Sequence, residues 1–197
     1  MLDRRLNLVI PVDTDAGTVH VHSMPLHKDV FDRYFLVMSK AFALIFKEGL
    51  SVIAGPRVAA RLIRAAAEQL GVWEDGEAPD GTVILGVKNG LMQEIWRLSN
   101  VLAPTEAGGW APMPLADAVK RQIIDEDDAD EVEGVICFFI LISAMHKRRD
   151  VGAHLDSLQL WQARPTSLTL TEYLNSLPTS TTEDDITSKG NPSSIPG

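Results

Sequence analysis

The sequence predicts a mainly α-helical protein: a helical bundle with a small N-terminal β-hairpin and a disordered C-terminal tail. Apolar side chains recur every three or four positions over residues 26–48 and 56–70, the period of one helix face. Residues 125–149 contain a run that is apolar all round, between an acidic start and a basic end. Two short β-branched runs near the N-terminus flank a turn. Of the last 23 residues, 16 are Ser, Thr, Pro, Gly or Asn, too polar to order. We expect one domain over residues 1–177 and a Ser/Thr-rich tail over 178–197.

The hairpin is predicted from residues 6–12 and 18–23, which are short and rich in β-branched side chains. The segment between them, DTDAG, has the composition of a turn. Because an isolated hairpin is only marginally stable in water, we expect it to pack on the helices that follow.

Three helices are marked most clearly. The first, over residues 26–48, is apolar over more than one stripe and ends before Gly49. The second begins at Pro56 and ends at Gly71. The third, over residues 125–149, has acidic groups in its first turns and cations at its end, which complements the helix dipole at both termini.

The remaining segments are less regular. Residues 82–87 fit either a strand or the start of a helix, and residues 91–102 have helical spacing. Gly and Pro indicate a loop over residues 104–114. Short helices are expected over residues 114–124 and 167–177.

Composition excludes several classes of protein. With 18 Lys and Arg against 27 Asp and Glu, the net charge is −9, which disfavours nucleic acid as a partner. The longest uncharged apolar run, residues 135–145, is far shorter than the roughly 20 residues of a membrane-spanning helix. The N-terminus lacks the features of a signal peptide. The single Cys137 fits a packed core thiol in a reducing compartment, so we expect a cytoplasmic protein.

No metal or cofactor is expected. His20 and His22 project from one face of the predicted strand, but no third or fourth ligand stands nearby in sequence. The acidic run that begins at Asp125 is not an EF-hand, because Asp130 and Ile136 occupy the positions that require Gly and Glu. Structural roles are favoured for both groups of residues.

Motifs of catalysis are also missing. The sequence has neither a Walker phosphate loop nor a Gly-x-Ser-x-Gly nucleophile elbow, and Cys137 lies in an apolar run that does not activate a thiol. We therefore predict that the protein is not an enzyme. An enzyme with dispersed catalytic residues stays an alternative, and a deep pocket with a perturbed carboxylate beside His146 or His154 would favour it.

The helical segments carry more apolar side chains than one core-facing stripe requires. Most of them fill a core, and the remainder predicts a surface that holds an apolar segment of a partner protein. The expected contact residues are Phe31, Phe35, Met38 and Phe42, and secondarily Phe138 and Phe139.

Several stretches resemble tail assembly chaperones of long-tailed, siphovirus-like bacteriophages. They are LNLVIPV (residues 6–12), VHVHSMPL (19–26), VFDRYF (30–35), GLMQEI (90–95), RLSNVL (97–102), and the segment from FF to AMHK (138–147). The similarity extends over roughly residues 4–175 and contains no catalytic signature.

The resemblance implies a largely helical protein of the host cytoplasm that coats the apolar tape measure protein and helps tail tube subunits polymerise around it. Such chaperones are not retained in the virion. They often have a longer, frameshifted form that recruits the tail tube protein, and the Ser/Thr-rich end suits a flexible junction of that kind. Self-association into a homo-oligomer along the client is compatible with this role. The alternative within phage biology is a structural tail or head-to-tail connector component that stays in the particle.

Overall fold

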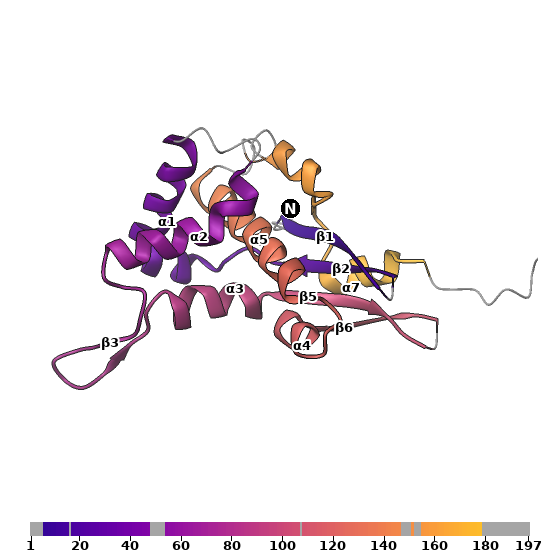
Figure 1. The fold of residues 1–197 in the computed structure, drawn as a ribbon, viewed down its shortest axis with the longest axis horizontal. Coiled ribbons are helices and arrows are strands. Elements are labelled where there is room, and N and C mark those ends of the chain that lie inside the picture. Colours follow the sequence, from indigo (N-terminus) through magenta and orange to yellow (C-terminus); the bar gives the residue numbers. More distant parts are fainter. Residues whose placement is uncertain are drawn as a thin grey trace, which may run out of the picture.

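The computed structural model describes residues 6–15, 17–47, 54–106, 108–146, 151 and 155–178. Its centre is a five-stranded antiparallel sheet with strand order β6-β5-β2-β1-β7, accompanied by a separate two-stranded sheet of β3 and β4 (Figure 1). The protein is therefore mixed α/β, and the expectation of a mainly α-helical bundle is wrong.

The predicted N-terminal hairpin forms the middle of the large sheet. Strands β1 (Asn7–Thr14) and β2 (Gly17–Ser23) pair antiparallel with Ile10 opposite Val21. Gly17 closes the turn with a backbone φ of 112°, a conformation that residues other than Gly rarely adopt. The hairpin does not lie alone against helices as expected, because both of its outer edges pair with further strands.

Three strands of the sheet lie where a helix, a loop or no regular structure was predicted. They are β5 (Ser99–Pro104), β6 (Trp110–Pro114) and β7 (Arg164–Thr166). Strand β5 is buried on both faces, so Val101 and Leu102 are both apolar and the alternation typical of a strand is absent. Strand β6 is an edge strand, a position in which prolines such as Pro112 are tolerated.

The predicted long helices are present as α1 (Lys28–Lys47), α2 (Gly55–Gln69) and α5 (Glu126–Met145). Helix α5 contacts β1 of the sheet as well as α1 and α2, which explains why it is apolar all round (Figure 1). Asp125 caps its first turn by accepting a hydrogen bond from the backbone N–H of Asp128 (2.7 Å). The cations predicted to follow its end at residues 147–149 lie outside the described residues.

Gly134 lets α2 and α5 approach closely, because a Cβ atom at this position would lie 2.6 Å from the carbonyl oxygen of Pro56. The core between the helices and the sheet includes Phe138, Phe139 and Met38, all of which are fully buried. Cys137 is a buried free thiol, as predicted, and burial raises its pKa well above the ordinary value.

Short elements complete the chain. The segment after α2 contains β3 (Gly76–Glu77), β4 (Val83–Ile84), the π-helix η1 (Lys88–Met92) and α3 (Gln93–Arg97). The predicted short helices are α4 (Leu115–Lys120) and α7 (Leu170–Ser176), and a 3-10 helix η2 (Asp156–Trp161) precedes β7.

The C-terminal segment covers the face of the sheet opposite α5. Asn7 donates a side-chain hydrogen bond to the carbonyl of Leu168 (2.8 Å), and Trp110 donates one to the carbonyl of Pro178 (2.9 Å). The sheet is thus sandwiched between helices and this segment. Residues 179–197, most of the predicted disordered tail, lie outside the described residues. Among the helices described, none combines the length and hydropathy needed to traverse a bilayer.

Candidate protein-binding groove

An apolar groove of about 610 Å³ lies between α1, the end of α2 and strand β4. Its lining residues are Arg33, Tyr34, Leu36, Val37, Leu70, Val72, Val83, Ile84 and Leu85. The aliphatic side chains around it are unusually open to solvent: Leu36 is 64% exposed and Val83 63% exposed. Five of the eight large hydrophobic residues that the described chain exposes line this one groove. Single exposed hydrophobic residues are common on soluble proteins, whereas a contiguous exposed apolar patch is typical of a protein-binding surface.

Tyr34 joins the two sides of the groove. Its hydroxyl donates to the carbonyl of Leu85 (3.2 Å), which follows β4 in the chain. Gly90, in η1, makes room for this ring, because a Cβ atom there would overlap the Tyr34 hydroxyl oxygen. Tyr34 itself has non-helical dihedrals (φ −105°, ψ 15°) at a kink in α1. The groove therefore depends on a specific aromatic contact between α1 and the segment that carries β4.

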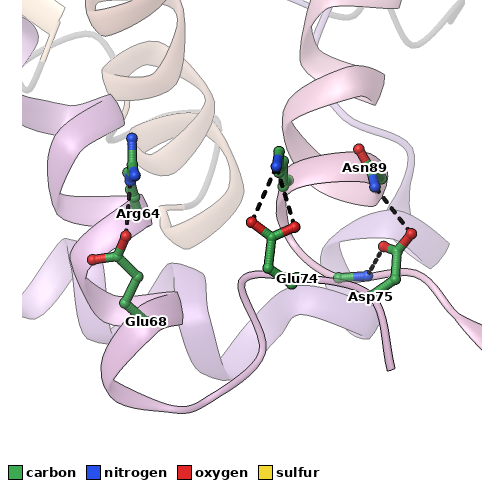
Figure 2. Close-up of polar contacts among 7 residues, drawn as sticks. Arg64, Glu68, Glu74, Asp75 and Asn89 are labelled. Atoms are coloured by element: carbon green, nitrogen blue, oxygen red, sulfur yellow. Dashed lines mark hydrogen bonds and ion pairs between the residues drawn. The ribbon is translucent and has the colours of Figure 1, made fainter. Parts of the chain in front are cut away.

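Polar contacts fix the base of the β3–β4 hairpin (Figure 2). One Asp75 carboxylate oxygen accepts from the backbone N–H of Gly86 (2.8 Å), and the other accepts from the Asn89 side chain (2.9 Å). The hydrogen bond from Asn89 and that from Gly86 lower the pKa of Asp75. Lys88 binds both oxygens of Glu74, at 3.0 and 3.2 Å. Two adjacent residues of η1, Lys88 and Asn89, therefore hold the two adjacent residues Glu74 and Asp75 at the base of the hairpin.

A second set of contacts holds the end of α2, which supplies Leu70 to the groove. Arg64 binds Glu68 on the same helix (2.8 Å; Figure 2) and lies over the ring of Trp73 at 5.2 Å from its centroid. Both walls of the groove are thus braced outside the apolar surface. The walls are held by these contacts, and no element of the described chain covers the aliphatic side chains between them.

The predicted contact residues are divided by the structure. Met38, Phe138 and Phe139 are fully buried, so they cannot contact a partner while the fold is intact. Phe42 packs on Phe46, with ring centroids 4.4 Å apart. These residues belong to the core or its margin because α5 lies directly against α1.

Phe31 and Phe35 remain on the surface of α1, with their rings 5.6 Å apart in an edge-to-face arrangement. Phe35 is 49% exposed, whereas Phe31 is partly buried against the core. Neither residue lines the groove. They nevertheless flank its residue Arg33 in sequence, on the same helix.

Most residues that form the groove carry little signal in the sequence. Leu36 lies off the apolar stripe of α1 and so carries no periodic signal. The run of Val83, Ile84 and Leu85 was considered only as a strand or a helix start, although three consecutive apolar residues in a short polar hairpin were a usable signal. Only the fold shows that Leu36 and this run face a common hollow.

The histidines and acidic residues do not form a metal site among the described residues. In the part of the chain that the structure describes, no three His, Cys, Asp or Glu side chains gather as metal ligands. His20 and His22 lie beneath α7, where both contact the ring of Tyr173. His146 contacts the ring of Phe42 at the end of α5. His154 lies outside the described residues.

Burial raises the pKa of two carboxylates on α5, Asp128 and Glu133, and Glu133 is the more deeply placed of the two. Glu133 accepts a hydrogen bond from the indole N–H of Trp96 (2.5 Å). It lies in the first half of α5, whereas His146 follows the end of that helix. The arrangement specified for the enzyme alternative, a perturbed carboxylate beside His146, is therefore not formed by Glu133.

Comparison with known proteins identifies no relative, because no family model, curated protein or solved structure matches the chain.

Proposed function

We propose that the protein is a phage tail assembly chaperone that holds an apolar segment of the tape measure protein in the groove between α1 and β4. The observation that carries the proposal is the clustering of exposed aliphatic side chains in one braced hollow. A chaperone for an apolar client needs such a surface in its folded state, because the client would otherwise aggregate through the same side chains.

The residues behind the family resemblance support this assignment. The stretch VFDRYF (30–35) supplies Arg33 and Tyr34 to the groove, and GLMQEI (90–95) begins with the Gly90 that accommodates Tyr34. Two stretches that lie about sixty residues apart thus meet at one structural feature, the base of the groove.

Charge specifies the client further. Arg33 is the single charged residue among those that line the groove. We therefore expect a client segment that is mainly aliphatic and carries an acidic residue beside Arg33, since an unpaired carboxylate elsewhere in the groove would lose its hydration without compensation. The net charge of −9 favours solubility of the chaperone, because like charges oppose non-specific association between its copies.

The test is co-expression of the chain with the tape measure protein, followed by pull-down and size-exclusion chromatography. The wild-type chain is expected to keep the tape measure protein soluble and to co-elute with it. Leu36→Asp and Val83→Asp each place a charge in the apolar hollow, and each is expected to reduce the co-eluting client at least about tenfold, equivalent to ~1.4 kcal/mol.

Leu160→Asp is the matched control, since Leu160 is 68% exposed and does not line the groove. This variant should retain the client. Circular dichroism checks that all three variants are folded. Loss of binding by Leu160→Asp to the same extent, or full binding by both groove variants, would remove the groove from the mechanism. A wild-type chain that fails to bind the tape measure protein would remove the chaperone function itself.

A further inference from the structure

A second hollow, a cleft of about 700 Å³ between α2 and α5, differs from the groove in being lined mostly by charges. Its basic wall consists of Arg57, Arg61 and Arg64 on α2, with Lys88 on η1. Its acidic wall consists of Asp127, Asp128, Asp130, Glu131 and Glu133 on α5. Side chains of opposite sign therefore face one another across an open space.

The two walls do not neutralise each other by direct contact. Among the described residues, no ion pair within 4.0 Å crosses the cleft. Arg64 pairs with Glu68 and Lys88 with Glu74, both outside the acidic wall. Arg57 and Arg61 form no ion pair with any described residue, and nor do Asp127 and Glu131. Each wall thus keeps a concentration of like charge.

The unpaired charges are arranged in matching pairs. Arg57 and Arg61 are four residues apart on one helix, and so are Asp127 and Glu131 on the other, which puts each pair on a single helix face with Cβ atoms about 6 Å apart. The helices are held at a fixed distance by the contact of Gly134 with Pro56. The walls cannot simply collapse onto each other without losing this contact.

The cleft also has an apolar part of its lining. Ala60, Trp73 and Met92 line the cleft. Glu133, which also lines the cleft, is partly buried and accepts a hydrogen bond from the indole N–H of Trp96. The cleft therefore combines anion-binding groups, cation-binding groups and apolar surface in one lining.

We propose that the cleft binds a small zwitterion with the two charges separated by methylene groups, an ω-amino acid in chemical class. Its carboxylate pairs with Arg57 and Arg61, its ammonium group pairs with Asp127 and Glu131, and its methylenes contact Trp73 and Met92. A ligand with one charge satisfies one wall and is repelled by the other, so the cleft selects for both charges at once. This site is separate from the apolar groove and does not depend on the chaperone function.

The test is an NMR titration of the full-length chain, in which the indole N–H signals of Trp73 and Trp96 report on the cleft. The probes are glycine, γ-aminobutyrate and ε-aminocaproate at constant ionic strength, with butyrate and butylamine as singly charged controls. We expect saturable shifts for at least one zwitterion at about millimolar concentration and at least about tenfold weaker binding of both controls.

Variants identify the walls. Arg61→Ala and Glu131→Gln are each expected to weaken binding of the best zwitterion about tenfold, whereas Arg121→Ala, an exposed cation outside the cleft, leaves it unchanged. The proposal is overturned if no zwitterion gives a saturable shift with the wild-type chain, or if butyrate or butylamine binds equally well. It is also overturned if the wall variants bind as the wild type does. If no zwitterion binds the wild-type chain and the wall variants have lower thermal midpoints than the wild type, the charges only stabilise the pairing of α2 with α5.

Discussion

Single residues decide whether the groove between α1 and β4 exists. Tyr34 reaches from α1 to the backbone after β4, and Gly90 is the residue that leaves space for its ring. Neither role is visible in sequence, where Tyr34 is one more member of an apolar stripe and Gly90 merely weakens a helix prediction. A glycine required by a neighbouring ring differs from a glycine required by its own φ angle, and only the former applies here.

The first prediction follows from that contact. Gly90→Ala forces the Tyr34 ring or η1 to move, and we expect a loss of about 1–3 kcal/mol in the free energy of unfolding. Urea unfolding followed by circular dichroism measures the change. Gly76→Ala is the matched control, because a Cβ atom at Gly76 meets nothing within 4 Å and its φ is not positive. Equal stability of the Gly90 and Gly76 variants would show that the contact with Tyr34 is not tight.

At the scale of elements, α7 and the segment before it form a cover over the outer face of the sheet. Helix α7 has no buried residue of its own and begins with a capping box of Thr169 and Glu172. It is attached through contacts with strand residues: Tyr173 approaches His20 Nδ1 (3.3 Å), and the Leu168 carbonyl lies 3.2 Å from His22 Nε2. Polar and aromatic contacts to histidines, more than apolar burial, hold this cover.

The second prediction concerns pH. Burial lowers the pKa of His20 and of His22, so both bind protons more readily in the unfolded chain than in the fold. Stability from these groups is fully present above the unfolded value of about 6.5 and falls as pH decreases below it. The urea midpoint of the wild-type chain is expected to decrease from about pH 7.5 to about pH 5.5.

His22→Gln should show a smaller decrease than the wild-type chain over the same range, because the titrating group beneath α7 is removed. His27→Gln, at an exposed histidine of the loop before α1, should behave as the wild type does. Comparing variants is necessary because the raised pKa of Glu133 contributes with the opposite sign: its stabilisation is lost as pH rises through that pKa. A His22 variant with the wild-type pH dependence would contradict the assignment.

At the scale of the whole molecule, the proposed chaperone function predicts where the protein is found. A chaperone leaves its client when tail tube subunits replace it, whereas a structural tail or connector component stays in the particle. We therefore expect mass spectrometry to detect the chain in lysates of infected cells and not in purified virions. Detection in virions at a stoichiometry like that of tail proteins would favour the structural alternative.

The sequence determined the elements whose contacts are local. The β1–β2 hairpin and helices α1, α2 and α5 follow from spacing, turn chemistry and helix-terminal residues within a few positions of one another. Such signals survive in one dimension because a helix or a tight turn is stabilised by residues that are neighbours in the chain.

Tertiary structure decided what depends on residues far apart. Strand β5 exists because His20 pairs with Leu102, and β7 exists because Asn7 pairs with Thr166, although both segments lack the alternation of a half-exposed strand. The same holds for surfaces. Large apolar side chains that suggest a binding face in the sequence are buried under other helices, namely Met38, Phe138 and Phe139. Leu36 and Val83, in contrast, are exposed because no described element covers them. Exposure is a property of the assembled layers, which the order of residues alone does not specify.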